Sequence, residues 1–254
     1  MFQVDAFASK PFEGNPAAVI PLEKWLPESI MQAIALENNL SETAFFVPTE
    51  GGYHIRWFTP LHEVDLCGHA TLASAFVLLE ILAQGSKQIS FASKSGPLHV
   101  TKKGELIELD FPTQAPKTCE IPDQILRSFG KAEECLVGED YIVVLENEEE
   151  VLHAAPNFLD LSGLDRRGIS ITAPSHKYDF VSRFFAPKYG VNEDPVTGSS
   201  FTQLIPYWSK RLGKKRMKAK QVSERGGIVL CEDVGERVLI SGKATLYMKA
   251  TINF

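Results

Sequence analysis

The chain has 254 residues, enough for one large domain or two of ordinary size. Its hydrophobic fraction of 44% and charged fraction of 23% are typical of a soluble globular protein with a substantial core. The net charge of −6 argues against a nucleic-acid partner, because binding phosphates requires clustered Lys and Arg.

Hydrophobic patterns in the first half of the chain predict many strands and two helices. The predicted strands cover 1–7, 17–20, 43–47, 53–58, 88–92, 97–101 and 105–110. One helix is predicted over 27–39, where Pro27 suits the first turn, and a second, rich in Ala and Leu, over 70–82. The proline-rich segment 111–122 is the candidate linker between an N-terminal domain, 1–111, and a C-terminal domain, 112–254.

The second half has a similar organisation. The predicted strands cover 135–138, 141–145, 168–172, 217–222, 228–232, 237–241 and 244–252, and the last of these can cross into the first domain. Helices are predicted over 156–161 and 200–212, and the acidic run 146–150 is typical of a solvated turn or a helix start. Many strands around one long apolar helix in each half indicate the α+β class.

A sequence echo links the two halves. Arg56-Trp57-Phe58-Thr59-Pro60 recurs as Arg183-Phe184-Phe185-Ala186-Pro187, 127 residues later, which is half of the 254-residue chain. Downstream of each copy, a glycine marks the start of a predicted helix, in Cys67-Gly68-His69 and in Thr197-Gly198-Ser199. Helix starts carry backbone N–H groups without intrahelical partners and a partial positive charge, which suits a carboxylate. We therefore expect two related halves that each offer a helix N-terminus to a shared site.

Other sequence signals exclude several chemistries. The chain has no Gly-x-Gly-x-x-Gly, phosphate loop or His-Glu-x-x-His, and no Gly-x-Ser-x-Gly elbow, which argues against nucleotide enzymes, zinc proteases and esterases. Its four cysteines form no Cys-x-x-Cys pair and its six histidines are scattered, so we expect neither a disulfide framework nor a metal site. Without a signal-peptide pattern or an apolar run of about 20 residues, a cytoplasmic protein without membrane contact is expected.

Glu42 is the most informative single residue. It lies at the joint between a predicted helix and the apolar run Phe45-Phe46-Val47, where partial desolvation would raise its pKa toward a value useful for acid–base work. The alternative is a solvated Glu in a turn or one paired with a Lys. His69 is either a neutral donor and acceptor at the rim of an anion pocket or a residue that only caps a helix.

Three further residues have two interpretations each. Asp194 either orients a substrate amine or hydroxyl or accepts local backbone N–H bonds in its loop. Ser199 either contacts the ligand or caps its own helix. Cys67 is either a thiolate acid–base group, because a helix start lowers thiol pKa, or a small buried apolar residue.

Six short motifs occur in order along nearly the whole chain. They are Asp5-Ala6-Phe7, Gly14-Asn15-Pro16, Leu40-Ser41-Glu42-Thr43, Phe58-Thr59-Pro60, Cys67-Gly68-His69-Ala70-Thr71 and Glu193-Asp194-Pro195-Val196-Thr197-Gly198-Ser199. Together they resemble the signature of the PhzF-like phenazine-biosynthesis family. The resemblance implies the diaminopimelate epimerase-like fold: two pseudo-symmetric lobes, each a barrel-like, mainly antiparallel sheet around a central helix, with the site in the cleft between them.

The resemblance also implies roles for individual residues. Glu42 matches the family's proton-shuttling glutamate, and His69, Asp194 and Ser199 match residues that line the site and hold polar groups of the substrate; Glu42, His69 and Asp194 are the expected catalytic residues. The remaining positions expected to line the site are Asn15, Cys67, Gly68, Ala70, Thr197 and Gly198. The family uses no cofactor or metal, and its members are often homodimers, which is the assembly expected here.

Two positions depart from related patterns. Racemases of this fold use two cysteines, one from each half, whereas this chain has Cys67 in the first half and Thr197 in the second. Threonine is too weak an acid and base for that role at neutral pH, which argues against racemisation by two thiols. In addition, Phe201 stands where a small residue is expected and is predicted to alter the pocket.

These observations predict a cofactor-independent isomerase that moves a proton on a small carboxylate-bearing metabolite, with Glu42 as the acid–base group. One alternative is an amino-acid epimerase or racemase that uses Cys67 with Glu42 or His69. A second alternative is a scaffold that binds small ligands or other proteins without catalysis.

Overall fold

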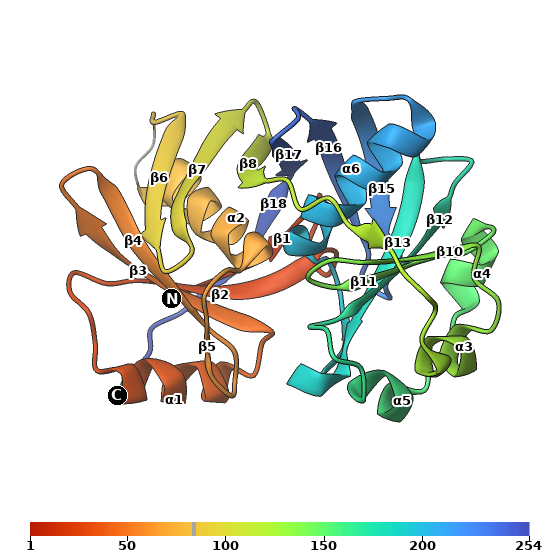
Figure 1. Ribbon diagram of the computed structural model, residues 1–254. Helices are drawn as coiled ribbons and strands as arrows, with labels where there is room; N and C mark the ends of the chain where they lie inside the picture. The colour runs from red at the N-terminus through yellow and green to blue at the C-terminus, as the bar shows by residue number, and fades with distance from the viewer. Residues whose placement is uncertain (83–84, 254) are drawn as a thin grey trace. The chain divides into compact units, whose positions relative to one another are not determined.

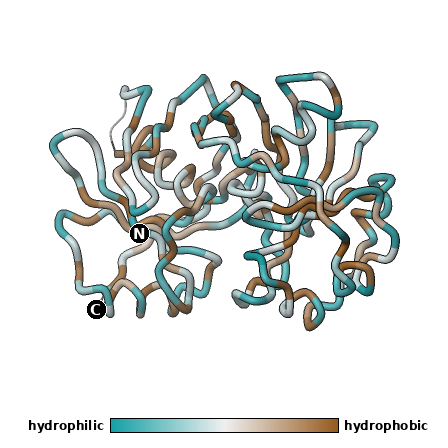
Figure 2. The backbone as a smooth tube through the Cα atoms, viewed as in Figure 1, coloured by the Kyte–Doolittle hydropathy of each residue, from teal (hydrophilic) through white to brown (hydrophobic). Residues whose placement is uncertain are grey.

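A computed structural model describes residues 1–82 and 85–253 of the chain. The chain divides into two compact units. Unit 1 comprises 1–110 and 241–254, and unit 2 comprises 111–240. No helix among the described residues combines the length and the apolar character that crossing a membrane requires. In both units, hydrophobic residues concentrate in strands and central helices, while polar residues concentrate in the connections (Figure 2).

Unit 1 is a sheet-rich unit with one helix that is buried over all but its last residue. Its elements are β1 (Phe2–Ala6), β2 (Asn15–Pro21), α1 (Glu28–Asn38), β3 (Glu42–Thr49), β4 (Gly52–Phe58), β5 (Glu63–Val64), α2 (Gly68–Phe76), η1 (Val77–Leu82), β6 (Gln88–Ser93), β7 (Gly96–Lys103), β8 (Leu106–Pro112) and β18 (Ala244–Lys249). The strand β8 ends just inside unit 2. The helix α2 lies among the strands and contacts β1, β2, β3 and β18 (Figure 1).

The strand pairing of unit 1 places the ends of distant segments side by side. β1 pairs antiparallel with both β2 and β18, β2 pairs parallel with β3, and β3 pairs antiparallel with β4. β4 pairs antiparallel with β5 and parallel with β6, and β6, β7 and β8 form an antiparallel meander. The parallel register aligns Ala17 with Glu42, so the residues just before these two positions are neighbours.

Unit 2 has a matching set of elements. They are β9 (Lys117–Thr118), α3 (Asp123–Phe129), β10 (Glu134–Val137), β11 (Tyr141–Val144), α4 (Glu148–His153), α5 (Phe158–Ser162), β12 (Ile169–Pro174), β13 (Phe180–Ala186), η2 (Pro187–Tyr189), β14 (Val191–Asp194), η3 (Gly198–Ser200), α6 (Phe201–Leu212), β15 (Arg216–Gln221), β16 (Gly227–Asp233) and β17 (Arg237–Gly242), which ends just inside unit 1. The helix α6 buries an apolar face and contacts β16 (Figure 1).

The pairing of unit 2 repeats that of unit 1. β10 and β11 are antiparallel, β11 and β12 parallel, β12 and β13 antiparallel, and β13 pairs antiparallel with β14 and parallel with β15. This is the order of pairings from β1 to β6 in unit 1. β15 and β16 then form an antiparallel pair, as β6 and β7 do.

The sequence echo corresponds to the same arginine clamp in each unit. Arg56 donates to both carboxylate oxygens of Glu63, over 2.7 and 2.8 Å, and its guanidinium lies 5.1 Å from the ring centre of Phe58. Arg183 donates to both oxygens of Glu193, over 2.7 and 2.9 Å, and lies 5.1 Å from the ring centre of Phe185. A bidentate pair that joins a central strand to the next one therefore occurs in both halves, and the predicted duplication is confirmed at this level.

Most of the predicted elements are present, and the α+β class is confirmed. The helix predicted over 70–82 begins two residues earlier, at Gly68, and its last part, η1, is a π-helix. The prediction missed α3, because only Ile125 of that helix is buried and no apolar period arises. The acidic run proves to be a helix start: the side chain of Asn147 accepts a hydrogen bond from the Glu150 N–H at the beginning of α4. The predicted linker contains the short strand β9.

Candidate functional site

Glu42 lies at the joint between a helix and a strand, as the sequence predicts. The helix α1 ends at Asn39, which has the left-handed conformation that often terminates helices (φ 49°) and donates its N–H to Ala35. Two residues later Glu42 begins β3, and its side chain is 18% exposed. The Glu42 carboxylate is therefore mostly buried, and Glu42 is not the solvated turn residue that the sequence left as an alternative.

Asn15 is held next to Glu42 and His69 by the turn between β1 and β2. The turn needs glycine at position 14, because φ is +65° there and a Cβ would lie 2.0 Å from the carbonyl oxygen of Ala6. Asn15 itself is completely buried. Its Nδ2 lies 3.3 Å from Nδ1 of His69, and its Oδ1 accepts a hydrogen bond from the hydroxyl of Ser41 over 3.5 Å.

The first residues of α2 belong to the same cluster as Asn15 and Glu42. Cys67 is extended at the N-cap and makes no side-chain cap, and the first intrahelical bond runs from the Thr71 N–H to the Cys67 carbonyl. The amides of Gly68, His69 and Ala70 precede that bond, at the positive end of the helix. Such amides suit an anionic ligand group.

His69 is a neutral, buried imidazole. It is 3% exposed, and burial lowers its pKa to about 3, against a smaller opposing effect of a hydrogen bond with the backbone of Pro16. Its Nε2 lies 3.4 Å from Oε2 of Glu42, and Sγ of Cys67 lies 3.5 Å from its Nδ1. A neutral imidazole offers one donor and one acceptor, so His69 can hold a substrate group and a proton at once. The side chain of the N-cap residue, Cys67, does not cap α2.

The same three side chains have the donor set of a metal site. One ligand atom each from Glu42, Cys67 and His69 lies within 4.8 Å of the other two. Carboxylate, thiolate and neutral imidazole are all zinc ligands, and three protein ligands leave the open position typical of catalytic zinc. The sequence did not predict a metal site here, because Glu42 lies 25 residues before Cys67 and only the fold brings these ligand atoms together.

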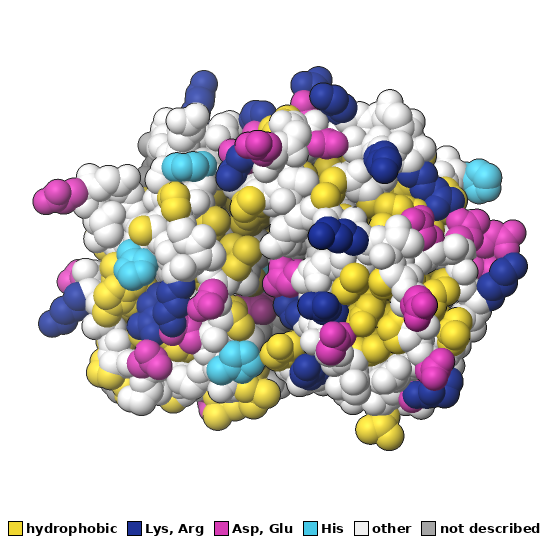
Figure 3. Space-filling model, in the orientation of Figure 1, with side chains coloured by type: hydrophobic (Ala, Val, Ile, Leu, Met, Phe, Trp, Pro, Cys, Tyr) yellow, Lys and Arg dark blue, Asp and Glu magenta, His cyan; other side chains and the backbone are white. Residues whose placement is uncertain are grey.

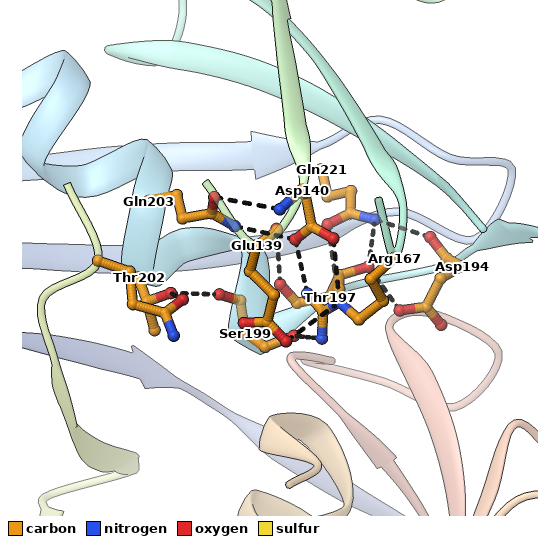
Figure 4. Close-up of polar contacts among 11 residues, drawn as sticks. Glu139, Asp140, Arg167, Asp194, Thr197, Ser199, Thr202, Gln203 and Gln221 are labelled. Carbon is orange, nitrogen blue, oxygen red and sulfur yellow. Dashed lines mark hydrogen bonds and ion pairs between the residues drawn. The ribbon is translucent and has the colours of Figure 1, made fainter. Parts of the chain in front are cut away.

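In unit 2, Asp194 and Thr197 belong to one tightly bonded loop. Asp194 ends β14, and its Oδ2 accepts a hydrogen bond from the Thr197 hydroxyl over 2.5 Å. Gln221, which is completely buried, accepts from the Thr197 N–H over 2.9 Å and donates to the Asp194 carbonyl over 2.7 Å (Figure 4). Gln221 therefore fixes the loop from both ends.

Ser199 is bound by an arginine that is paired with a buried carboxylate. Arg167 donates from Nη1 to the Ser199 hydroxyl over 2.9 Å, and from Nε and Nη2 to the two carboxylate oxygens of Asp140, over 3.0 and 2.6 Å (Figure 4). Asp140 is completely buried and also accepts from the Gln203 amide over 2.9 Å. Ser199 does not cap α6, whose N-cap is Ser200 and which has no side-chain cap.

The second glycine-marked helix start differs from the first. Gly198 begins the short 3-10 turn η3, and α6 follows only from Phe201. Phe201 is completely buried, and its ring lies 6.1 Å from that of Phe180. The side chain predicted to alter the pocket is thus part of the core of unit 2.

The structure gathers the predicted site residues into one cluster in each unit. Unit 1 holds Asn15, Glu42, Cys67, Gly68, His69 and Ala70, and unit 2 holds Asp194, Thr197, Gly198 and Ser199. The prediction missed four polar residues that support the second cluster: the buried Asp140, Gln203 and Gln221, and the partly buried Arg167. No local signal marks Gln203, because α6 also buries Thr202 and Ser209 and Gln203 lies off its apolar stripe.

The surface agrees with the net negative charge of the sequence. On the face shown in Figure 3, Lys and Arg side chains are interspersed with Asp and Glu, and many are paired with them. This face carries no continuous basic patch of the kind that binds a phosphate backbone.

Comparisons with known proteins agree with the geometry. An uncharacterized isomerase of Pseudomonas aeruginosa is 54% identical over 254 residues, which is all of this chain and 98% of that protein. The crystal structure of a phenazine biosynthesis PhzF-family protein of Enterococcus faecalis superposes with a TM-score of 0.94 and 51% identity, over 97% of this chain and 96% of that one. A probable proline racemase from Agrobacterium radiobacter, at 9% identity, has a TM-score of 0.66 over 99% of this chain and 92% of its own.

The racemase shares the fold alone, and with it the two-lobed, epimerase-like architecture expected from the sequence. The other two matches extend over the whole chain at high identity. The model of the phenazine biosynthesis-like (PhzC-PhzF) family matches residues 4–250, and the chain belongs to this family.

Proposed function

We propose that this chain is a cofactor-independent isomerase that moves a proton on a small, carboxylate-bearing metabolite. The observation that carries the proposal is the buried pair of Glu42 and His69 at the start of α2, with 3.4 Å between Oε2 and Nε2. An isomerase is also what the name of the 54% identical relative states for that protein.

Glu42 is the proposed acid–base group. Its side chain is only 18% exposed, so a bound substrate would remove most of its remaining water. The amides of Gly68, His69 and Ala70 bind the substrate carboxylate and thereby acidify the adjacent C–H bond. Glu42 takes that proton and returns it to another atom on the same face of the substrate.

His69 and Asp194 have supporting roles in this proposal. Because burial lowers the pKa of His69 to about 3, the imidazole is neutral at pH 7. It can therefore donate a hydrogen bond without placing a positive charge beside the Glu42 carboxylate. Asp194 accepts from Thr197 and would orient a polar substrate group, and Ser199 and the Gly198 amide would add hydrogen bonds. The proposed setting is a homodimer in the cytoplasm.

The first experiment is proton–deuterium exchange in D₂O. Wild type and Glu42→Gln are incubated with a panel of small amino and cyclic acids, and carbon-bound protons are followed by NMR. Glu50→Gln is the matched control, because Glu50 is exposed and directly follows the last residue of the same strand, Thr49. We expect wild type and Glu50→Gln to exchange or isomerise a substrate and Glu42→Gln to lose at least about a hundredfold in rate.

Equal rates for Glu42→Gln and wild type on a turned-over substrate would remove Glu42 from the mechanism. Cofactor independence is tested with the same assay after exhaustive dialysis against a chelator. Retained activity supports the proposal, and a loss that Zn²⁺ restores would assign a metal to Glu42, Cys67 and His69.

A second candidate is an epimerase that uses Cys67. It is favoured by the 3.5 Å contact between Sγ of Cys67 and the His69 ring, which places a thiol beside a proton acceptor. Cys67→Ser distinguishes the two: near-normal turnover supports the Glu42 mechanism, whereas loss of activity with an intact fold supports the thiol. If no substrate is turned over but ligands bind, the non-catalytic scaffold becomes the better explanation.

A further inference from the structure

Two cysteines of unit 2 face each other across an antiparallel ladder. β9 and β10 pair Lys117 with Val137 and Thr118 with Leu136. The next step of this register sets Cys119 opposite Cys135, and the Cys119 N–H donates to the Cys135 carbonyl over 2.9 Å. Residues directly opposite in an antiparallel pair have Cα atoms about 4.5 to 5.5 Å apart, which lies within the range that a disulfide spans.

Their side chains point toward one another. The two sulfur atoms are 3.6 Å apart, in van der Waals contact, so a small rotation about each Cα–Cβ bond brings them within bonding distance. Both residues belong to the same hydrophobic environment, Cys135 within a buried cluster and Cys119 packed against its edge. No metal group among the described residues includes either cysteine.

The two thiols differ in access to solvent. Cys119 is half-buried at the edge of the sheet, whereas Cys135 is buried. Burial, together with the contact to Cys119, raises the pKa of the Cys135 thiol to about 12, so Cys135 is not the thiol that meets an oxidant first. A partly exposed thiol next to a buried partner is the arrangement of an attacking and a resolving cysteine.

We propose that Cys119 and Cys135 form a reversible disulfide when the protein meets a small-molecule disulfide such as oxidised glutathione. The Cys119 thiolate attacks one sulfur of the oxidant, a mixed disulfide forms, and one glutathione thiolate leaves. The Cys135 sulfur then attacks the Cys119 sulfur, loses its proton to solvent and releases the second glutathione. Two protein thiols lose two electrons in total, and one glutathione disulfide is reduced to two thiols.

The link would fasten β9 to β10 and close a loop that contains α3, between Cys119 and Cys135. Neither cysteine belongs to the site assigned to catalysis, so the inference is independent of the proposed function. A disulfide restricts the unfolded chain, and the oxidised protein should therefore melt at a higher temperature than the reduced one.

The experiment uses the full chain incubated with glutathione disulfide, then alkylated without reduction and digested with trypsin. The two cysteines fall on different tryptic peptides, 118–127 and 132–166, so the link joins two otherwise separate masses. We expect this cross-linked species in wild type, its disappearance after reduction, and a higher melting temperature for the oxidised protein.

Variants distinguish this link from general thiol oxidation. Cys119→Ser and Cys135→Ser should both lose the cross-linked peptide and the rise in melting temperature, and Cys119→Ser is the milder change because the site is half-buried. Cys231→Ser is the matched control, since Cys231 is buried in the same unit but is not paired with another cysteine among the described residues, and it should retain both. A glutathione adduct that persists on Cys119 without the link, or a link that forms only in denaturant, would overturn the proposal.

Discussion

The buried pair of Asp140 and Arg167 yields a quantitative prediction about stability. Asp140 is completely buried, and its two carboxylate oxygens accept from Arg167 over 3.0 and 2.6 Å. Replacing Asp140 by Asn removes the charge and turns one acceptor into a donor that faces the guanidinium. Removing one partner of a buried pair generally costs about 3 to 5 kcal/mol, because the remaining charge is left without compensation.

The structure places this case at the lower end of that range. The Arg167 side chain is 29% exposed, so water can solvate part of the guanidinium once its partner is neutral. Asp140→Asn is therefore expected to lower the free energy of unfolding by about 3 kcal/mol. Arg167 also holds the Ser199 hydroxyl, so a second effect is expected on any activity that needs Ser199.

Asp160→Asn provides the control for this prediction. Arg127 and Asp160 also form a 2.6 Å ion pair in unit 2, but their side chains are 56% and 21% exposed. Exposed pairs contribute less than about 1 kcal/mol, so this variant should unfold almost like wild type. Both variants are compared by urea unfolding, followed by circular dichroism and tryptophan fluorescence. Equal losses in the two variants, or a loss below about 1 kcal/mol for Asp140→Asn, would refute the reasoning.

Three further predictions concern the supports of the two clusters. Burial lowers the pKa of His69 from 6.5 to about 3, so below pH 6.5 the unfolded chain binds a proton that the folded protein excludes. The free energy of unfolding should therefore fall as the pH drops from 6.5 toward 3. Urea titrations at several pH values measure this dependence, and His69→Gln should flatten that part of the curve. Gln221→Ala leaves the Thr197 N–H without its acceptor and should lower the free energy of unfolding by about 1 to 3 kcal/mol. It should also lower kcat/KM, measured on an identified substrate, and unchanged kinetics would argue against a positioning role. Gly14→Ala would put its new Cβ 2.0 Å from a backbone atom and should lower the free energy of unfolding by more than about 3 kcal/mol. Gly104→Ala has a φ of +64° but no atom within 4 Å, and should lower it by about 1 kcal/mol. Similar melting temperatures for the two variants would contradict this.

The fold was largely predictable from local signals. Apolar alternation located most strands, and the Arg-aromatic echo correctly indicated two related halves, because a duplicated strand keeps the residues that its neighbours need. Glu42 and His69 could be singled out because each sits at the end of an element, where a polar residue beside an apolar run is conspicuous.

The support of the second cluster was not predictable by the same means. Asp140 and Arg167 are 27 residues apart, and only the parallel register of β11 and β12, which aligns Tyr141 with Ile169, makes them neighbours. No local period encodes that register. The contact of Cys119 with Cys135 was missed for the same reason, because their spacing matches no motif and the pairing of β9 with β10 creates it.

The residues at the start of the parallel strand pair differ in chemistry between the two units. In unit 1 the first residues of the parallel strands β2 and β3 bring Asn15 beside Glu42, and the nearest ionisable ring, His69, is kept neutral by burial. In unit 2 the residues before β11 and β12 bring together Asp140 and Arg167, whose charges compensate each other.

Both carboxylate oxygens of Asp140 are bound by Arg167, over 3.0 and 2.6 Å, whereas the Glu42 carboxylate lies beside an imidazole that burial keeps neutral. The unit 2 counterpart of Cys67 is Thr197, whose hydroxyl is already committed to Asp194. A racemase needs an acid–base group on each face of the substrate, and this chain concentrates such groups in one unit. The asymmetry therefore agrees with the proposal that Glu42 moves the proton along a single face.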